Sequence, residues 1–235
     1  MKDATNISVE LPPTPPRKFN CEMNVLKNTD GSALYSEGDT EVMVGVYGPA
    51  DLKENKQEVH EALVDVDFRP KHGSPTLAEK YLMQFIQGVC ENAIMLTLHP
   101  RTVFAIIVQI MQDQGSLLSC AINATCMALQ DAGIAMKYMP VAVTVAIKSE
   151  VHSDIEDPTD VIIVNPNLKE ETESFAVLTY VFDNVKQNLL CTHTRGPMLP
   201  KQHERCLETA RGATERVLTF FRESITQKVA AGLEI

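Results

Sequence analysis

A short turn at residues 113–116 (DQGS) carries the clearest chemical signal in the sequence. It follows an apolar run at residues 102–111, which has the length and composition of a buried strand. It precedes residues 116–132, whose apolar spacing predicts a helix that Gly133 ends. A turn that opens a helix is expected to point free backbone N–H groups outward, and such groups bind phosphate and other anions. The spacing therefore predicts a backbone geometry suited to an anion.

The side chains beside this turn do not complete such a site. The next two residues are Leu117 and Leu118, whereas a site that handles phosphate normally adds an arginine or a lysine to match the charge and the fork geometry of the anion. The scaffold is typical of an enzyme that lacks one of its charged groups. Asp113 is interpreted either as a helix cap or turn residue, or as a remnant of an active pocket.

Basic residues form one cluster and one isolated position. Arg69, Lys71 and His72 lie in the loop RPKHGSP, and Lys80 stands near the start of the next predicted helix. This cluster is interpreted either as a contact for phosphate groups or as a solvated loop that balances nearby acidic residues. Arg101, in the segment HPRT, is interpreted either as a phosphate contact or as a partner of an acidic group on a neighbouring chain.

The remaining pattern predicts an α/β fold, more closely an α+β two-layer arrangement with a mixed sheet and packed helices. Three short segments separated by turns predict an antiparallel meander, and a strand follows at 61–68. A helix is predicted at 76–98, and a second group of strands at 141–148, 161–164, 175–182 and 185–192 precedes a long helix from Pro200. We expect a flexible N-terminal tail at 1–18, one domain at 19–228 and a C-terminal tail at 229–235.

Composition excludes several classes of protein. The chain has 235 residues, of which 44% are hydrophobic, so it has enough apolar residues for a full core. Because its net charge is −10, it would bind RNA only through a local basic patch or a basic partner. Six cysteines without a CxxC pair predict reduced core residues, and six histidines without close spacing predict no metal site. No segment is long and apolar enough for a bilayer, and no signal peptide is visible, which favours the nucleus and the cytoplasm.

The placed segments resemble the RNase PH family, and within it the ring subunits of the RNA exosome. The resemblance covers about residues 19–228 and is carried by four stretches of sequence, namely CEMNVLKNTDGSALYSEGDTEVMVGVYGPA (21–50), HPRT (99–102), QDQGSLLSCAINATCMALQDAGIAM (112–136) and VIIVNPNLKEETESFAVLTYVF (161–182). It implies an RNase PH-like fold similar to domain two of ribosomal protein S5. Phosphorolytic members of the family remove 3′ nucleotides from RNA with inorganic phosphate as the attacking group.

The resemblance also implies which residues such chemistry needs. The family binds phosphate with the arginine of a G-[ST]-R turn, and this position holds Leu117. The family's acidic motif D-L-[ND]-x-x-E-D begins here at Asn165, so the lead aspartate is replaced. A leucine supplies no charge, and an asparagine has no titratable proton and is a weaker ligand for a hard cation. We therefore expect no catalytic residues, no metal and no cofactor.

The function implied by the resemblance is a non-catalytic structural subunit of the exosome core ring. Such a subunit supports 3′–5′ processing and degradation of RNA, including rRNA maturation, and lines the RNA channel with Arg69, Lys71, Lys80 and Arg101. The implied partners are RNA, other RNase PH-type subunits in a hexameric ring, S1/KH cap proteins and an associated catalytic nuclease; the implied location is the nucleus, with the nucleolus, and the cytoplasm.

The alternative is an active phosphate-dependent exoribonuclease with relocated groups. In that reading Arg101 or Lys80 replaces the missing arginine, and Glu170 or Glu171 replaces the missing aspartate. The register of the acidic residues at 165–173 stays open, so Glu170, Glu171 and Glu173 are not assigned as metal or proton-transfer groups.

Overall fold

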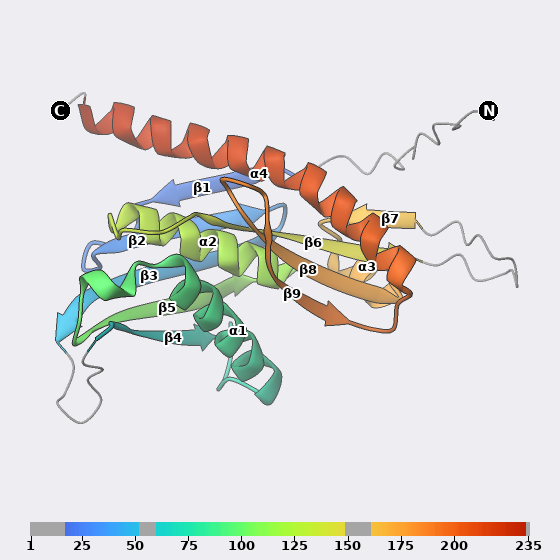
Figure 1. Ribbon diagram of the computed structural model, residues 1–235, viewed down its shortest axis with the longest axis horizontal. Helices are drawn as coiled ribbons and strands as arrows, with labels where there is room; N and C mark the ends of the chain where they lie inside the picture. Colours follow the sequence, from blue (N-terminus) through green and yellow to red (C-terminus); the bar gives the residue numbers. More distant parts are fainter. Residues whose placement is uncertain (1–16, 52–59, 149–160, 234–235) are drawn as a thin grey trace, which may run out of the picture.

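The computed structural model describes residues 17–51, 60–148 and 161–233 (Figure 1). Five strands form a first sheet, in the order β1 (Phe19–Met23), β2 (Gly31–Glu37), β3 (Thr40–Asp51), β5 (Thr102–Gln112) and β4 (Leu63–Arg69). Strands β1, β2 and β3 form the predicted antiparallel meander, and β5 pairs with β3 in the antiparallel sense. Strand β4 lies parallel to β5, which makes this the mixed sheet expected from the sequence.

The second half of the chain forms a separate antiparallel sheet, a division that the sequence did not reveal. Its order is β7 (Val161–Val164), β6 (Pro140–Lys148), β8 (Ala176–Asp183) and β9 (Leu189–Arg195). Strands β8 and β9 form the predicted hairpin, but the prediction that its second strand starts at residue 185 is wrong. The Asp183 carboxylate accepts a hydrogen bond from the Val185 N–H at 2.9 Å, and Gln187 has a φ of +52°, so residues 184–188 form the turn.

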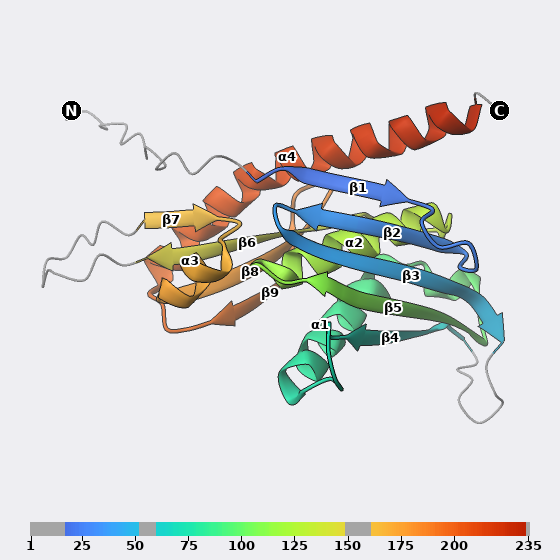
Figure 2. The ribbon, with the colours of Figure 1, turned by 180° about the vertical axis from the view of Figure 1, so that it is seen from behind.

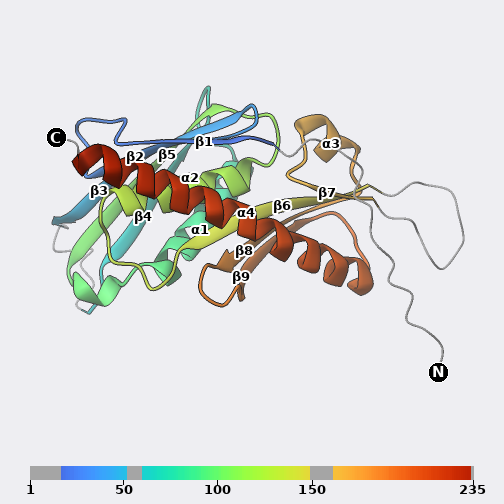
Figure 3. The same ribbon diagram turned by 90° about the horizontal axis from the view of Figure 1, so that it is seen from above.

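Helix α2 (Leu117–Asp131) lies between the two sheets and is buried along almost its whole length (Figures 2 and 3). Helix α1 (Leu77–Ala93) packs against β4 and starts in a capping box of Thr76 and Glu79. The predicted helix at 76–98 was too long, because α1 ends at Ala93 and a separate 3-10 turn, η2 (Leu96–Leu98), follows.

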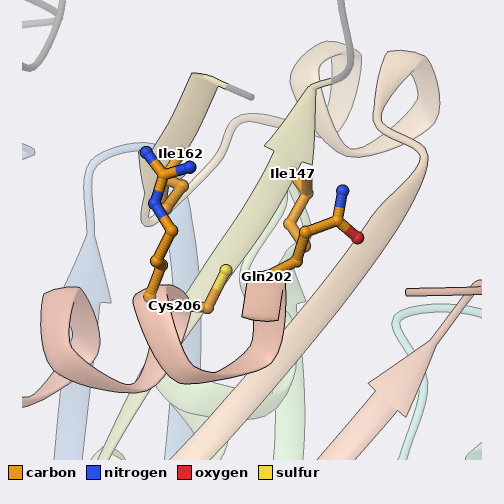
Figure 4. Close-up of a pocket in the computed structure, with 5 residues that line it drawn as sticks. Ile147, Ile162, Gln202 and Cys206 are labelled. Carbon is orange, nitrogen blue, oxygen red and sulfur yellow. The ribbon is translucent and has the colours of Figure 1, made fainter. Parts of the chain in front are cut away.

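Helix α4 (Pro200–Leu233) crosses the second sheet and reaches β1 of the first (Figure 3). The expected C-terminal tail at 229–235 is wrong for residues 229–233, which continue the helix. Near its start, α4 packs on the strands through a narrow apolar seam where Cys206 and Gln202 meet Ile147 and Ile162 (Figure 4). No helix in the described part of the chain has both the length and the apolar character needed to cross a membrane.

Asn123 joins α2 to the second sheet in the core. Strand β7 pairs only with residues 145–148 of β6, so the outer edge of β6 at Ala142 has no neighbouring strand in the described part of the chain. The Asn123 side-chain amide donates to the Ala142 C=O at 3.0 Å, and its carbonyl oxygen accepts from the Ala142 N–H at 2.9 Å. The amide thus takes the place of a paired strand for two buried backbone groups.

Glu37, at the end of β2, is a fully buried carboxyl group. Neither of its carboxyl oxygens has a hydrogen-bond partner among the described residues. Burial raises the pKa of Glu37 to about 8, and the positive charges of Arg17 and Arg216 oppose this shift. The side chain is therefore protonated over most of the neutral range.

We expect Asn123→Ala to lower the free energy of unfolding by about 2–4 kcal/mol, because two buried backbone groups of Ala142 lose their partners. Urea denaturation measures this change. The matched control is Asn92→Ala on α1, whose exposed side chain donates only to the Gly88 carbonyl and whose loss should change stability little. Equal effects of the two substitutions would contradict this account of Asn123.

We expect the stability of the protein to fall as the pH rises from about 4.5 to about 8. In the unfolded chain Glu37 releases its proton near its ordinary value of 4.5, whereas the folded protein keeps this proton up to about pH 8. Between these two pH values, the folded state binds more protons than the unfolded state. The stabilisation from Glu37 is therefore complete below about pH 4.5 and lost above about pH 8. Urea denaturation across the pH range measures this slope.

Glu37→Gln should flatten this pH dependence, because a neutral amide of the same shape has no proton to lose. Glu22→Gln, on the exposed face of β1, is the control that should retain the slope. An unchanged slope in Glu37→Gln would show that another group is responsible.

Candidate functional site

The turn at residues 113–116 connects β5 to α2, as predicted, and packs against the segment that follows β7. Gly115 has a φ of +99°, and a Cβ at this position would lie 2.6 Å from the Pro166 carbonyl oxygen and from the backbone of Asn167 and Leu168. Ser116, the N-cap of α2, is also left-handed, with a φ of +55°. Only glycine fits at position 115, because the second sheet approaches the backbone there directly.

Three backbone N–H groups of this turn are bonded within the protein, so the expectation that they point outward is wrong. The Gln114 N–H donates to the Thr40 hydroxyl at 3.1 Å, and the Gly115 N–H donates to the Asp113 carboxylate at 3.1 Å. The Ser116 N–H donates to the Glu171 carboxylate at 2.5 Å. Of the two interpretations of Asp113, the turn role is confirmed. Asp113 does not cap α2, which begins at Ser116 without a side-chain cap bond.

Glu171 therefore lies where an anion would meet the start of α2. It comes from α3 (Leu168–Glu173), a one-and-a-half-turn helix after β7 (Figure 2). Burial raises the pKa of Glu171, the hydrogen bond from the Ser116 N–H opposes this rise, and the nearby Asp113 charge adds to it. A carboxylate at this donor both occupies the site and repels a second anion.

Arg17 closes the same region from the N-terminal side. Its guanidinium donates to the Pro166 carbonyl at 2.7 Å, to the Gln114 carbonyl at 3.1 Å and to the Asn167 side-chain oxygen. Longer contacts reach the carbonyls of Glu37 at 3.4 Å and of Gly115 at 3.5 Å. The single side chain thus links three segments that are far apart in the sequence.

The position of Arg17 corrects the expected N-terminal tail. Residues 1–16 of the predicted tail lie outside the described residues, but Arg17 is fixed by these contacts. Sequence reasoning noted the basic pair Arg17 and Lys18 only as part of the tail. The local pattern gave no signal for contacts with residues about a hundred positions or more away.

Asn165 directly follows β7, at the position where the family motif has its lead aspartate. It has a φ of +53°, and its N–H donates to the Thr144 carbonyl at 2.8 Å. Its side-chain oxygen is buried without a hydrogen-bond partner among the described residues. Asparagine tolerates the left-handed conformation, which gives this residue a role in the backbone of the turn.

The register of the acidic residues in α3 is now defined. The Glu170 carboxylate accepts from the Asn167 N–H at 2.7 Å and closes the capping box of α3. Glu173 forms an exposed ion pair with Lys148 at 2.9 Å. Of the three, Glu171 alone reaches the 113–116 turn. Within the described ranges, no group of three or more histidine, cysteine or acidic side chains is placed to hold a metal ion.

The four predicted RNA contacts fall at two ends of the first sheet. Arg69 ends β4 opposite Gln109 of β5, and the Gln109 side chain donates to the Pro70 carbonyl at 3.2 Å, so the basic loop lies at the end where β5 enters the 113–116 turn. Arg101 stands before the start of β5. An eleven-residue strand at about 3.3 Å per residue places it roughly 35 Å from that turn.

The side chains of the basic cluster are largely exposed. Arg69 forms an ion pair with Asp67 at 2.7 Å, which fits the interpretation of a loop that balances nearby acidic groups. Lys71 and Lys80 are exposed, and no carboxylate of the described residues forms an ion pair with either of them. Arg195, at the end of β9, is a further exposed cation that the sequence reasoning missed.

Comparisons with known proteins agree with this architecture over nearly the whole chain. The 3′ exoribonuclease family matches through its domain 1 at residues 16–135 and its domain 2 at residues 138–213. The chain is 31% identical over 228 residues to the "Exosome complex exonuclease RRP46 homolog" of Arabidopsis thaliana, covering 90% of this chain and 92% of the relative. It is 28% identical to the "Exosome complex component RRP46" of Saccharomyces cerevisiae, covering 91% and 98%.

Solved structures show the same fold. The crystal structure of rice Rrp46 superposes with a TM-score of 0.83 at 30% identity and covers 92% of this chain and 98% of that one. The Archaeoglobus fulgidus exosome with RNA bound to its active site contains a chain with a TM-score of 0.72 at 20% identity, over 87% of this chain and 88% of that one. The two family matches meet where the first sheet with α2 gives way to the second sheet, and this chain belongs to the RNase PH family of 3′ exoribonuclease-type proteins.

Proposed function

We propose that this protein is a non-catalytic subunit of an RNA exosome core ring, in which it supports 3′–5′ RNA processing and degradation. The names of its relatives support the assembly, because plant, yeast and other proteins of about 30% identity over nearly their full length are called exosome components or exosome exonuclease homologues. The observation that carries the non-catalytic assignment is the Glu171 carboxylate on the Ser116 N–H.

The chemistry of phosphorolysis explains why this contact matters. Attack by inorganic phosphate requires an anion-binding group at the start of α2, and its charge normally comes from an arginine. Here the adjacent side chain is the neutral Leu117, and a carboxylate already accepts from the backbone donor. The nearby Arg17 guanidinium donates to carbonyl and amide oxygens of the protein itself. Phosphate would have to displace a like charge to bind.

The alternative of an active exoribonuclease with relocated groups has little geometric support. Arg101 is separated from the turn by the length of β5. Glu170 caps its own helix, and Glu171 faces the phosphate position itself. Lys80 is the remaining candidate of that alternative, and it lies on α1 with the basic loop.

RNA contact is assigned to Arg69, Lys71, Lys80 and Arg101, which would meet phosphates and not bases. Such contacts are independent of base sequence and weaken with salt. Because these residues lie at two ends of the first sheet, they would touch two separate parts of an RNA strand. This assignment is supported by the exposure of Lys71 and Lys80, because a chain of net charge −10 needs local cations to contact RNA.

Ring assembly fits the exposed strands of the two sheets. Strands β1 and β4 are the outer strands of the first sheet, and β7 and β9 are those of the second. A closed ring needs two different interfaces on each subunit, and outer strands with open backbone groups are suited to pairing with another chain. The proposed partners are other RNase PH-type subunits, S1/KH cap proteins and an associated catalytic nuclease, in the nucleus, the nucleolus and the cytoplasm.

We expect the purified protein, incubated with single-stranded RNA, magnesium and inorganic phosphate, to release no nucleoside diphosphates. Leu117→Arg alone should remain inactive, because Glu171 still occupies the Ser116 N–H and Asn165 still lacks a carboxylate. Chromatography of the released nucleotides measures both results. Release by the unmodified protein that disappears in Glu171→Gln would establish the active alternative, and activity in Leu117→Arg would show that the acidic side is functional.

We expect the double variant Lys71→Glu and Lys80→Glu to weaken RNA binding by the assembled ring. The slope of log K against the logarithm of the salt concentration should become shallower by about two, one unit for each lost phosphate contact. Fluorescence anisotropy at several salt concentrations measures the affinity and the slope. The control is Lys186→Glu, an exposed lysine in the β8–β9 turn, at the opposite end of these strands from Arg195. An unchanged slope in the double variant would place the basic loop away from the RNA.

A further inference from the structure

Tyr81 on α1 is a large aromatic side chain left 56% exposed, and it rests on a second ring from the other half of the chain. Its ring centroid lies 5.6 Å from that of His193 on β9, with an interplanar angle of 47°. Phe85, one helical turn further along α1, has its ring centroid 5.8 Å from that of His193, at an interplanar angle of 72°. His193 thus contacts both aromatic rings of α1, and Tyr81 is the most exposed member of this aromatic cluster.

Two cations lie close in sequence to this aromatic cluster. Lys80 precedes Tyr81 on α1, and Arg195 lies two residues after His193, on the same face of β9. No carboxylate of the described residues forms an ion pair with either cation. Glu79 accepts from the Thr76 N–H at 2.5 Å, and Asp67 pairs with Arg69. Glu171, whose pKa the charge of Arg195 acts to lower, accepts from the Ser116 N–H at 2.5 Å.

The charge of Arg195 acts on two groups of the protein. Burial raises the pKa of Glu171, and Arg195 is one of the charges that oppose this rise. Burial lowers the pKa of His193, and the charge of Arg195 adds to this shift. Because its pKa is lowered, His193 is neutral near pH 7, so the ring that contacts Tyr81 carries no charge.

We propose that Tyr81, supported by His193, stacks against a base of single-stranded RNA while Lys80 and Arg195 contact the adjoining phosphates. An exposed aromatic ring between cations has the composition of a surface that binds single strands without reading their sequence. This inference rests on the proposed RNA-channel function and adds a base-stacking position to it. A protein partner would also cover the exposed ring. However, β9 carries no acidic residue that would neutralise Lys80 and Arg195, and the positive charge of these two residues favours a polyanion.

The test compares two oligonucleotides of equal length, an oligouridylate and the same strand with abasic residues, on the assembled ring. Tyr81→Leu should weaken binding of the oligouridylate roughly 5- to 100-fold and leave binding of the abasic strand unchanged, because only the base stacks. Tyr81→Phe should keep full affinity. Tyr47→Leu on β3, another exposed tyrosine, is the matched control and should have no effect.

Two further measurements separate stacking from charge. Tyr81→Leu should leave the salt dependence of binding unchanged, whereas Arg195→Gln should reduce it by about one unit for either strand. An oligouridylate that carries 5-iodouridine should form a photocrosslink that peptide mapping assigns to Tyr81.

The proposal is overturned if Tyr81→Leu has no effect on the oligouridylate, or if it weakens both strands equally, which would show a structural role. An iodouridine crosslink that is absent from Tyr81, together with loss of a neighbouring subunit from the ring in Tyr81→Leu, would assign the surface to a protein interface. If the lysine double variant weakens RNA binding while Tyr81→Leu does not, the RNA contact stands and only the stacking position fails. If neither variant has an effect, the proposed RNA contact of this subunit fails as well, so the two failures are distinguishable.

Discussion

Gly115 packs against the backbone of residues 166–168 so closely that a single added carbon would come within 2.6 Å of it. This contact joins the two sheets, because Gly115 continues from β5 and residues 166–168 continue from β7. The Ser116 hydroxyl donates to the Pro166 carbonyl at 3.0 Å, and the Leu168 N–H donates to the Gln114 carbonyl at 2.9 Å. The place that resembles an active site is therefore also the joint between the halves of the domain.

The polar groups at this joint act mainly on one another. Asp113 and Thr40 accept from N–H groups of the turn, and Glu171 accepts from Ser116. The Arg17 guanidinium binds oxygens from both sides of the joint, so its charge is used to hold segments together. A phosphate-binding turn needs open donors and an uncompensated positive charge. Internal bonds occupy the N–H groups of residues 114–116, and Glu171 adds a negative charge there.

Local sequence patterns were sufficient for most elements, while the composition of the site depended on contacts that no local pattern contains. The meander, the β5–turn–α2 unit and the long final helix were predicted because each follows from periodicity and turn residues within a short window. Arg17 and Glu171 reach the turn from 97 and 55 positions away, and sequence alone could not place them. The division into two sheets also depends on long-range contacts and was missed. The end of the last helix was misplaced too, because α4 continues beyond residue 228.

Charge placement, and not total charge, decides where this acidic chain can meet RNA. Lys148, Arg69 and Lys228 each lie within an ion pair with a carboxylate, so their charges are largely cancelled at the surface. Lys71, Lys80 and Arg195 are exposed without such a pair in the described residues. Lys80 precedes the exposed Tyr81, and Arg195 lies two residues after its ring partner His193. The net charge of −10 repels a polyanion, but salt at physiological concentration screens this repulsion beyond about 8 Å. Within that distance, the local cations and the aromatic surface would determine the interaction with RNA that we propose.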